Sequence, residues 1–210
     1  PKYLSWWMDI DEKDILTIEQ EVSFSKNLKI IQVTGLGQVS KNRSSHCQGR
    51  VEALRHEFNL RHPDIKFIDF VKFCTDGDGG WFRDSRGSND FQNVTALATF
   101  GIPYQNIGSL EVLYLTLGDS NSNSKGTVHE EFQDFVDWAT QGEIKQAIGR
   151  LRAHNRLKQE LYFYFCADYD LSFLEQELEC INAGDITIEA GSLDEKSWWE
   201  VKQTVKELWE

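Results

Sequence analysis

The segment from Gly142 to Cys166 joins a helical pattern to an apolar strand, and this order constrains the fold more than any other feature. Apolar residues recur in its first half at helical spacing: Ile144, Ala147, Ile148 and Leu151. This spacing predicts a helix with one buried stripe. The run LYFYFCA at 161–167 is apolar throughout, as expected of a strand that is buried on both faces. A helix that leads into such a strand is typical of a parallel sheet, so we predict an α/β fold.

Other short runs extend this prediction to a whole sheet flanked by helices. Apolar and β-branched runs predict further strands at 14–19, 28–34 and 66–73. Apolar residues at helical spacing predict helices at 47–60, 106–117, 128–139, 171–181 and 198–208. Gly142 is expected to end the helix at 128–139 and to allow a turn into the next one.

Two arginines near the end of the first helical pattern are candidates for binding phosphate groups. At about 100° per residue, Gln146 and Arg150 are i,i+4 neighbours, whereas Arg152 falls on another side of the helix beside Lys145. A guanidinium group is planar and permanently charged, so it can stabilise charge that develops on a transferring phosphoryl group. Solvated basic residues on an amphipathic helix are the alternative interpretation of a lone Gly-Arg-x-Arg pattern.

A second polar motif lies upstream of the arginines. It consists of Arg86, Gly87, Ser88 and Asn89, followed by Asp90 and Phe91. The run ALATF at 96–100 then leads into Gly101-Ile102-Pro103. Ligands of open α/β sheets gather at the carboxyl ends of the strands. We therefore expect the loop at 86–89 to lie exposed at that edge, near the arginine helix.

Together these two segments resemble motifs V and VI of superfamily 2 helicases. An RGSN loop before the strand at 96–100, which ends in Gly-x-Pro, is similar to motif V. Gln-x-x-Gly-Arg at 146–150, followed closely by a second arginine, Arg152, is similar to motif VI. The resemblance covers roughly Asp14 to Leu174, in the order and separation of the two motifs. It points to the C-terminal RecA-like domains of plasmid and phage replication proteins, including the cyanobacterial plasmid replication family.

The resemblance implies a RecA-like domain that supplies an arginine finger to ATP. The finger is Arg150 or Arg152, with Gln146 beside it. Many superfamily 2 proteins have a further arginine three residues after the Gly-Arg arginine, whereas Ala153 occupies that place here, so the choice between the two arginines stays open. The resemblance also implies DNA contacts at 86–89: Arg86 would act by its charge, Gly87 by its backbone amide, and Ser88 and Asn89 by hydrogen bonds.

The chain has no G-x-x-x-x-G-K-[ST] loop of the kind that holds nucleotide phosphates and magnesium. We therefore expect ATP and Mg²⁺ to bind only together with a preceding RecA-like domain of the same protein, and this chain alone to hold no cofactor. DNA and that first domain are the expected partners. The isolated chain is expected to be inactive as an ATPase.

The net charge of the chain is −12, with 34 acidic and 22 basic residues. This balance argues against general electrostatic adhesion to DNA or to anionic membranes, so any DNA contact must be local. There is no run of eighteen apolar residues and no secretory pattern at the N-terminus, and we expect a cytoplasmic protein without a membrane partner. Four widely spaced cysteines without a C-x-x-C pair indicate reduced thiols and no metal site.

We predict three regions along the chain. Residues 1–25 form an interdomain connector or N-terminal extension, and 26–182 form the RecA-like domain. Residues 183–210 form a small helical appendage, either an acidic packing helix or the start of a helix-turn-helix unit. Trp81 and Phe82 could pack in the core or stack on a base, and we favour packing.

The residues also bear on several other functions. A non-enzymatic interaction module on the same fold is the main alternative to a motor domain. A serine hydrolase is disfavoured because no G-x-S-x-G motif occurs.

Two short glycine-rich segments do not match known binding motifs. Gly35-Leu36-Gly37 lacks the third glycine and the immediate helix of a dinucleotide fingerprint. The loop at 76–80 lacks the glutamate that a calcium loop needs at its twelfth position.

Overall fold

A computed structural model describes residues 2–16, 25–75, 78–82, 89–117 and 127–186 of the chain. The chain forms two compact units, each built from two separate stretches of sequence. We call residues 24–102 and 146–210 the sheet unit, and residues 1–23 and 103–145 the helical unit. The second stretch of the helical unit is inserted between two strands of the sheet unit.

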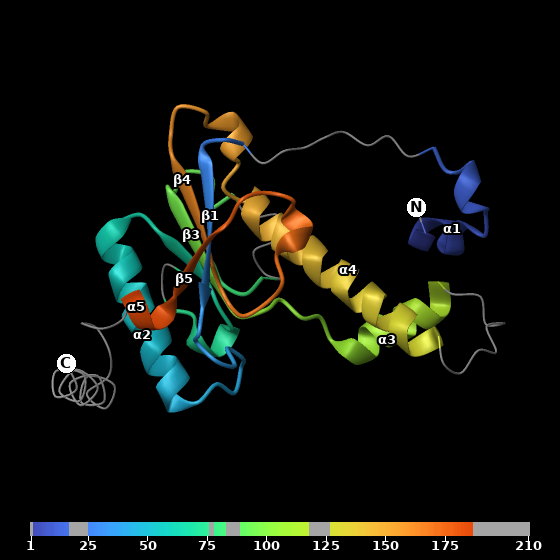
Figure 1. Ribbon diagram of the computed structural model, residues 1–210, viewed down its shortest axis with the longest axis horizontal. Coiled ribbons are helices and arrows are strands. Elements are labelled where there is room, and N and C mark those ends of the chain that lie inside the picture. Colours follow the sequence, from blue (N-terminus) through green and yellow to red (C-terminus); the bar gives the residue numbers. More distant parts are fainter. Residues whose placement is uncertain (1, 17–24, 76–77, 83–88, 118–126, 187–210) are drawn as a thin grey trace, which may run out of the picture. The chain divides into compact units, whose positions relative to one another are not determined.

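Five parallel strands make up the sheet of the sheet unit (Figure 1). They are β1 (Leu28–Thr34), β2 (Lys66–Ile68), β3 (Ala96–Phe100), β4 (Leu161–Cys166) and β5 (Glu179–Asn182). Their order in the sheet is β2-β3-β4-β1-β5. The register aligns Leu28 with Leu161 across the central pair β1 and β4, and Ala96 with Tyr162 across β3 and β4. The predicted α/β fold with a parallel sheet flanked by helices is confirmed.

One face of the sheet is covered by helix α2 (Ser45–Arg61), beside which the short helix α5 (Ala183–Ile186) lies (Figure 1). The helix begins at an N-cap, Ser44, whose side chain accepts a hydrogen bond from the amide of Cys47. Its apolar side chains join one core cluster with alternate residues of the strands. Phe58 stacks on Tyr164 of β4, with 4.2 Å between the ring centroids.

The opposite face of the sheet is buried as well. Phe163 and Phe165 of β4 and Leu97 of β3 point to this face and are fully buried, because successive strand residues alternate between the two faces. Strand β3 is buried at every position. Apolar residues on both faces explain why the run at 161–167 showed no polar alternation.

The helical unit has its own core. It contains α1 (Lys2–Met8), the short 3₁₀ helix η1 (Glu12–Asp14), α3 (Ile107–Leu117) and most of α4 (Thr127–Gly149). Leu110 and Tyr114 of α3 pack with Phe135 and Val136 of α4. Tyr3 of α1 meets the ring of Phe135 edge to face at 4.9 Å, which adds an aromatic contact to the apolar burial.

One predicted strand is shorter than the sequence indicated, and the described part of another is not a strand. Strand β2 ends at Ile68, and Val71–Phe73 form the 3₁₀ helix η2 instead of continuing the strand. The reason is Asp69, whose carboxylate accepts hydrogen bonds from Arg43 and Arg55. The chain leaves the sheet at this residue. At 14–19, Asp14 ends η1 and belongs to no strand, while 17–19 lie outside the described residues.

Two helix predictions were also wrong. The apolar spacing at 171–181 is divided between the 3₁₀ helix η4 (Ser172–Leu174) and strand β5, because the backbone at 179–182 pairs with β1 from Ile31 to Thr34. Helix α4 does not break at Gly142. A single internal glycine costs a helix about 1 kcal/mol, which the packing of α4 offsets. The predicted helix at 198–208 lies outside the described residues.

Candidate functional site

The candidate site is formed where helix α4 ends. The helix ends at Gly149, and the amides of Arg150 and Leu151 bond to Ala147 and Ile148, three residues back, at 3.1 and 3.3 Å. Arg152 then adopts the left-handed conformation, with φ 48° and ψ 43°. Neither arginine is part of the helix, so the spacing of about 100° per residue does not predict where their side chains point.

The turn that carries the arginines is held by buried contacts. Leu151 and Ala153 are buried on either side of Arg152. The side-chain amide of Asn27 donates to the carbonyls of Arg156 and Gln159 at 3.0 and 2.8 Å. These contacts fix the segment that leads from α4 to β4.

Arg156 joins this segment to the one before β3. Its Nη1 donates to the carbonyl of Val94 at 2.6 Å, two residues before β3 begins. The chain before β3 and the chain before β4 are thereby held side by side, and this brings the two sequence motifs together.

Arg152 makes the direct contact between the motifs. Its Nη2 donates to Oδ1 of Asn89 at 2.6 Å, and its Nη1 donates to Oε1 of Gln92 at 3.1 Å. Both acceptors are uncharged amides, so these two bonds orient the guanidinium without neutralising its charge. The side chains are exposed, which keeps the group within reach of a ligand.

A pocket of about 330 Å³ surrounds this contact. It is lined by Asn89, Gln92, Gln146, Gly149, Arg150 and Arg152. The prediction that the two arginines serve different directions is wrong, since both line one pocket with Gln146. The end of the helix at Gly149 and the left-handed backbone of Arg152 redirect their side chains.

The pocket lies at the amino end of the strands. Asn89 precedes β3 and Arg152 precedes β4, so the expected position of Asn89 at the carboxyl edge is wrong, although its expected proximity to the arginine segment is confirmed. In a parallel sheet the connection from β2 to β3 runs from the carboxyl end of β2 to the amino end of β3. Asn89 is closer in the chain to β3 than to β2 and therefore lies at the amino end. Arg86, Gly87 and Ser88 lie outside the described residues.

The carboxyl edge holds a buried ion cluster that the sequence analysis missed. Arg43 bonds to both carboxylate oxygens of Asp69 at 2.8 Å, and both side chains are fully buried. Arg55 bridges Asp69 at 3.0 Å and Asp78 at 2.9 Å. The signal in the sequence was Asp69 itself, a single charged residue inside the apolar run FIDFV.

The aromatic pair after β2 packs as predicted. Phe82 is buried, and the ring of Trp81 lies 4.4 Å from that of Phe70 and 5.3 Å from that of Phe82. These contacts favour a structural role over base stacking.

The cysteines are free thiols, and burial raises the pKa of the Cys166 thiol well above its ordinary value. Within the described ranges, no group of three or more His, Cys, Asp or Glu side chains is arranged to hold a metal ion. None of the helices described is long and apolar enough to cross a membrane.

Comparisons with protein-family models, with curated proteins and with solved structures found no match. The helicase resemblance therefore stays a prediction that rests on the two motifs.

Proposed function

We propose that this chain is the second motor domain of a superfamily 2 DNA helicase or translocase that acts in replication in the cytoplasm. The observation that supports this function is the hydrogen bond between Arg152 and Asn89. It links the segment similar to motif VI with the last residue of the segment similar to motif V. Asn89 and Arg152 are 63 residues apart in the chain, so the contact joins two motifs that are distant in the sequence.

The pocket fits the phosphates of a nucleotide held by another domain. Guanidinium groups bind phosphate oxygens through planar, paired donors and keep their charge at any physiological pH. The acceptors that orient Arg152 are neutral, so its charge can act on an anion. The metal ligands and the phosphate-binding loop would belong to a preceding RecA-like domain, whose ATP and Mg²⁺ this pocket would face.

The two arginines have different roles in this proposal. Arg150 is the finger that stabilises charge on the γ-phosphate. Arg152 is held by Asn89 and Gln92, and it transmits the position of the DNA-binding segment to the pocket. Gln146 lines the same pocket from the last turn of α4 and helps to position the phosphates.

The test uses the protein that carries this chain together with its preceding ATP-binding domain. We expect Arg150→Ala to lower DNA-stimulated ATP hydrolysis on the order of a thousandfold, as for other arginine fingers. Arg152→Ala should lower basal hydrolysis less and should weaken the stimulation by DNA and the salt-sensitive affinity for it. Arg61→Ala, which removes an exposed arginine that pairs with Glu57 on α2, is the matched control.

The outcomes separate the alternatives. A reversed pattern would make Arg152 the finger. If neither variant changes hydrolysis, the motor function is wrong and the fold serves as an interaction module. The isolated chain should release no phosphate from ATP with or without DNA, because it has no phosphate-binding loop to hold the nucleotide.

A further inference from the structure

Most of the large hydrophobic side chains that are exposed among the described residues lie in the helical unit. Among the residues that the structure describes, the large hydrophobic side chains that are exposed belong to this unit, except for Leu60, Val71 and Leu157. Single exposed apolar residues are ordinary, but their concentration on one small unit is typical of an interaction surface.

Helix α3 is apolar on both of its faces. Leu110 and Tyr114 point into the core of the helical unit. Val112 and Leu115, three residues apart on the outward face, are 66% and 60% exposed. Glu111 is the one charged residue in the whole helix. A helix that is apolar all round is usually buried on all sides, so the outward face of α3 is suited to a partner.

Helix α1 repeats this pattern on a smaller scale. Leu4, Trp7 and Met8 follow one another at i, i+3 and i+4 and are exposed, while Tyr3 packs against Phe135 and Trp138. The two helices thus share one core and present apolar side chains outward.

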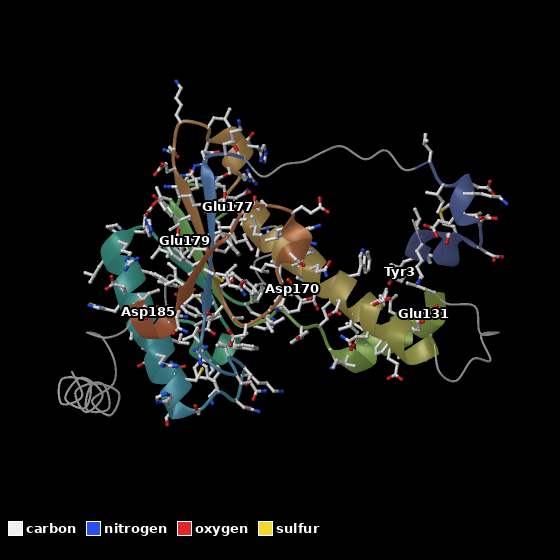
Figure 2. The ribbon with its side chains drawn as sticks, in the orientation of Figure 1. Tyr3, Glu131, Asp170, Glu177, Glu179 and Asp185 are labelled. Carbon is white, nitrogen blue, oxygen red and sulfur yellow. The ribbon has the colours of Figure 1, made fainter. Side chains whose placement is uncertain are left out.

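The same unit carries most of the net charge. Its two stretches contain thirteen acidic residues and four lysines, a net charge of −9 out of −12 for the whole chain. Carboxylates lie close to its aromatic side chains: Glu131 accepts a hydrogen bond from the hydroxyl of Tyr114 at 3.2 Å. Figure 2 shows Glu131 and Tyr3 on neighbouring helices. Burial, and then Asp134 and Glu131, raise the pKa of Tyr3.

We propose that the outward face of α3, centred on Val112 and Leu115, is a docking surface for a basic amphipathic helix of another protein. The apolar face would supply the affinity, and the acidic charge would attract and orient a helix that carries lysine or arginine beside its apolar side chains. A second copy of this chain would bring another strongly acidic unit against the first. DNA and anionic membranes carry the same sign of charge. The inference is independent of the proposed motor function.

The experiment measures binding of a fluorescent synthetic peptide to the whole chain. The probe is an amphipathic helix of about 18 residues, long enough for five turns, built from leucine on one face and lysine on the other. One control peptide has the same composition in scrambled order, and a second has glutamate in place of lysine. The affinity is determined by fluorescence anisotropy at low and high salt.

The test variant is Val112→Ser with Leu115→Ser, and the matched control is Leu60→Ser with Leu157→Ser. The control residues are equally exposed, at 66% and 71%, but lie in the sheet unit. All four side chains are on the surface, so circular dichroism should show unchanged folding. We expect the test variant to bind the leucine-lysine peptide on the order of tenfold or more weakly, because two apolar contacts are lost. The control variant should bind the leucine-lysine peptide like the wild type, and high salt should weaken the binding of this peptide by screening the attraction between its lysines and the acidic unit.

Three results would overturn the proposal. The first is equal affinity of the test variant and the wild type for the leucine-lysine peptide. The second is equal binding of the scrambled or the glutamate peptide, since the surface would then recognise charge alone or apolar content alone. The third is dimerisation in analytical ultracentrifugation that the test variant abolishes, because the face would then pair with a second copy.

Discussion

Asp69 shows how one residue can organise an edge of the sheet. It follows β2 directly, is fully buried, and accepts hydrogen bonds from Arg43, from Arg55 and from the amide of Phe70. Burying a carboxylate is costly unless its charge and lone pairs are satisfied. Here two guanidinium groups meet that need, and in doing so they fasten α2 and the loop before it to the end of β2.

Replacing this carboxylate should be strongly destabilising. Asp69→Asn leaves two buried guanidinium groups with less negative charge than they require, and we expect the free energy of unfolding to fall by about 3–5 kcal/mol. Urea denaturation monitored by tryptophan fluorescence measures this change. Asp170→Asn is the control, since Asp170 is exposed and accepts hydrogen bonds from the amide and the hydroxyl of Ser172. A loss for Asp69→Asn as small as that for the control would contradict this account.

His62 should make the stability depend on pH. Its Nε2 lies 2.9 Å from the hydroxyl of Tyr164, and burial lowers its pKa below the ordinary value of 6.5. The unfolded chain therefore binds a proton more readily than the folded chain. The contribution of neutral His62 to stability is complete above pH 6.5 and is lost as the pH falls from 6.5 toward the folded pKa.

The measurement compares urea unfolding of the wild type and of His62→Gln between about pH 7.5 and pH 5, across the ordinary titration range of histidine. The difference in unfolding free energy between them should shrink as the pH falls. His56→Gln, which changes an exposed histidine, is the control substitution. A difference that stays constant or grows toward pH 5 would show that His62 is not held in its neutral form.

A glycine inside a helix and a glycine beside a buried ring have different effects on stability, as Gly142 of α4 and Gly79 show. Gly142 lies inside the helix, and a Cβ added there would meet no atom within 4 Å. A Cβ added at Gly79 would lie 2.2 Å from the ring of Phe91. The first glycine only weakens its helix, whereas the second makes room for a fully buried ring.

Alanine substitutions should therefore have opposite effects at these two positions. We expect Gly142→Ala to raise the stability of α4 by about 0.5–1 kcal/mol, since alanine is the better helix former. Gly79→Ala should lower stability because the ring of Phe91 must move. Hydrogen exchange of the α4 amides and urea unfolding measure the two effects. The same sign of change for both variants would refute the explanation.

At the scale of the whole molecule, the described residues give each of the two units a core of its own. The core of the helical unit is centred on Tyr114 and Phe135, and a core of the sheet unit lies between α2 and the strands. Compact units with their own cores can open separately, each with its own free energy.

Core truncations should therefore act on one unit at a time. Phe135→Ala should cost about 3–5 kcal/mol in the helical unit and should raise hydrogen exchange at 103–117 while β1, β3 and β4 stay protected. Phe58→Ala, which removes the ring stacked on Tyr164, should raise exchange in the sheet unit instead. Exchange that rises equally in both units for either variant would indicate a single cooperative unit.

The sequence alone was sufficient where a run of residues is long and uniform in pattern. Strand β1, strand β4 and helix α2 have the positions that their apolar residues predicted, because burial of one face or both faces is a local property of such runs. Most residues of the candidate pocket, including Asn89, Gln146, Arg150 and Arg152, also belong to motifs in the sequence, whereas Gln92 belongs to none.

The tertiary structure decided every feature that depends on residues far apart in the chain. Strand β5 is a strand because β1 offers it a partner about 150 residues upstream, a choice that outweighs the helical spacing of its neighbours. The division into two units joins 1–23 to 103–145, which no local pattern indicates. The two arginines share one pocket because Arg152 takes a left-handed turn and bonds to Asn89 and Gln92. The local sequence determines which backbone conformations have low free energy, whereas packing and hydrogen bonds between distant segments select among these conformations.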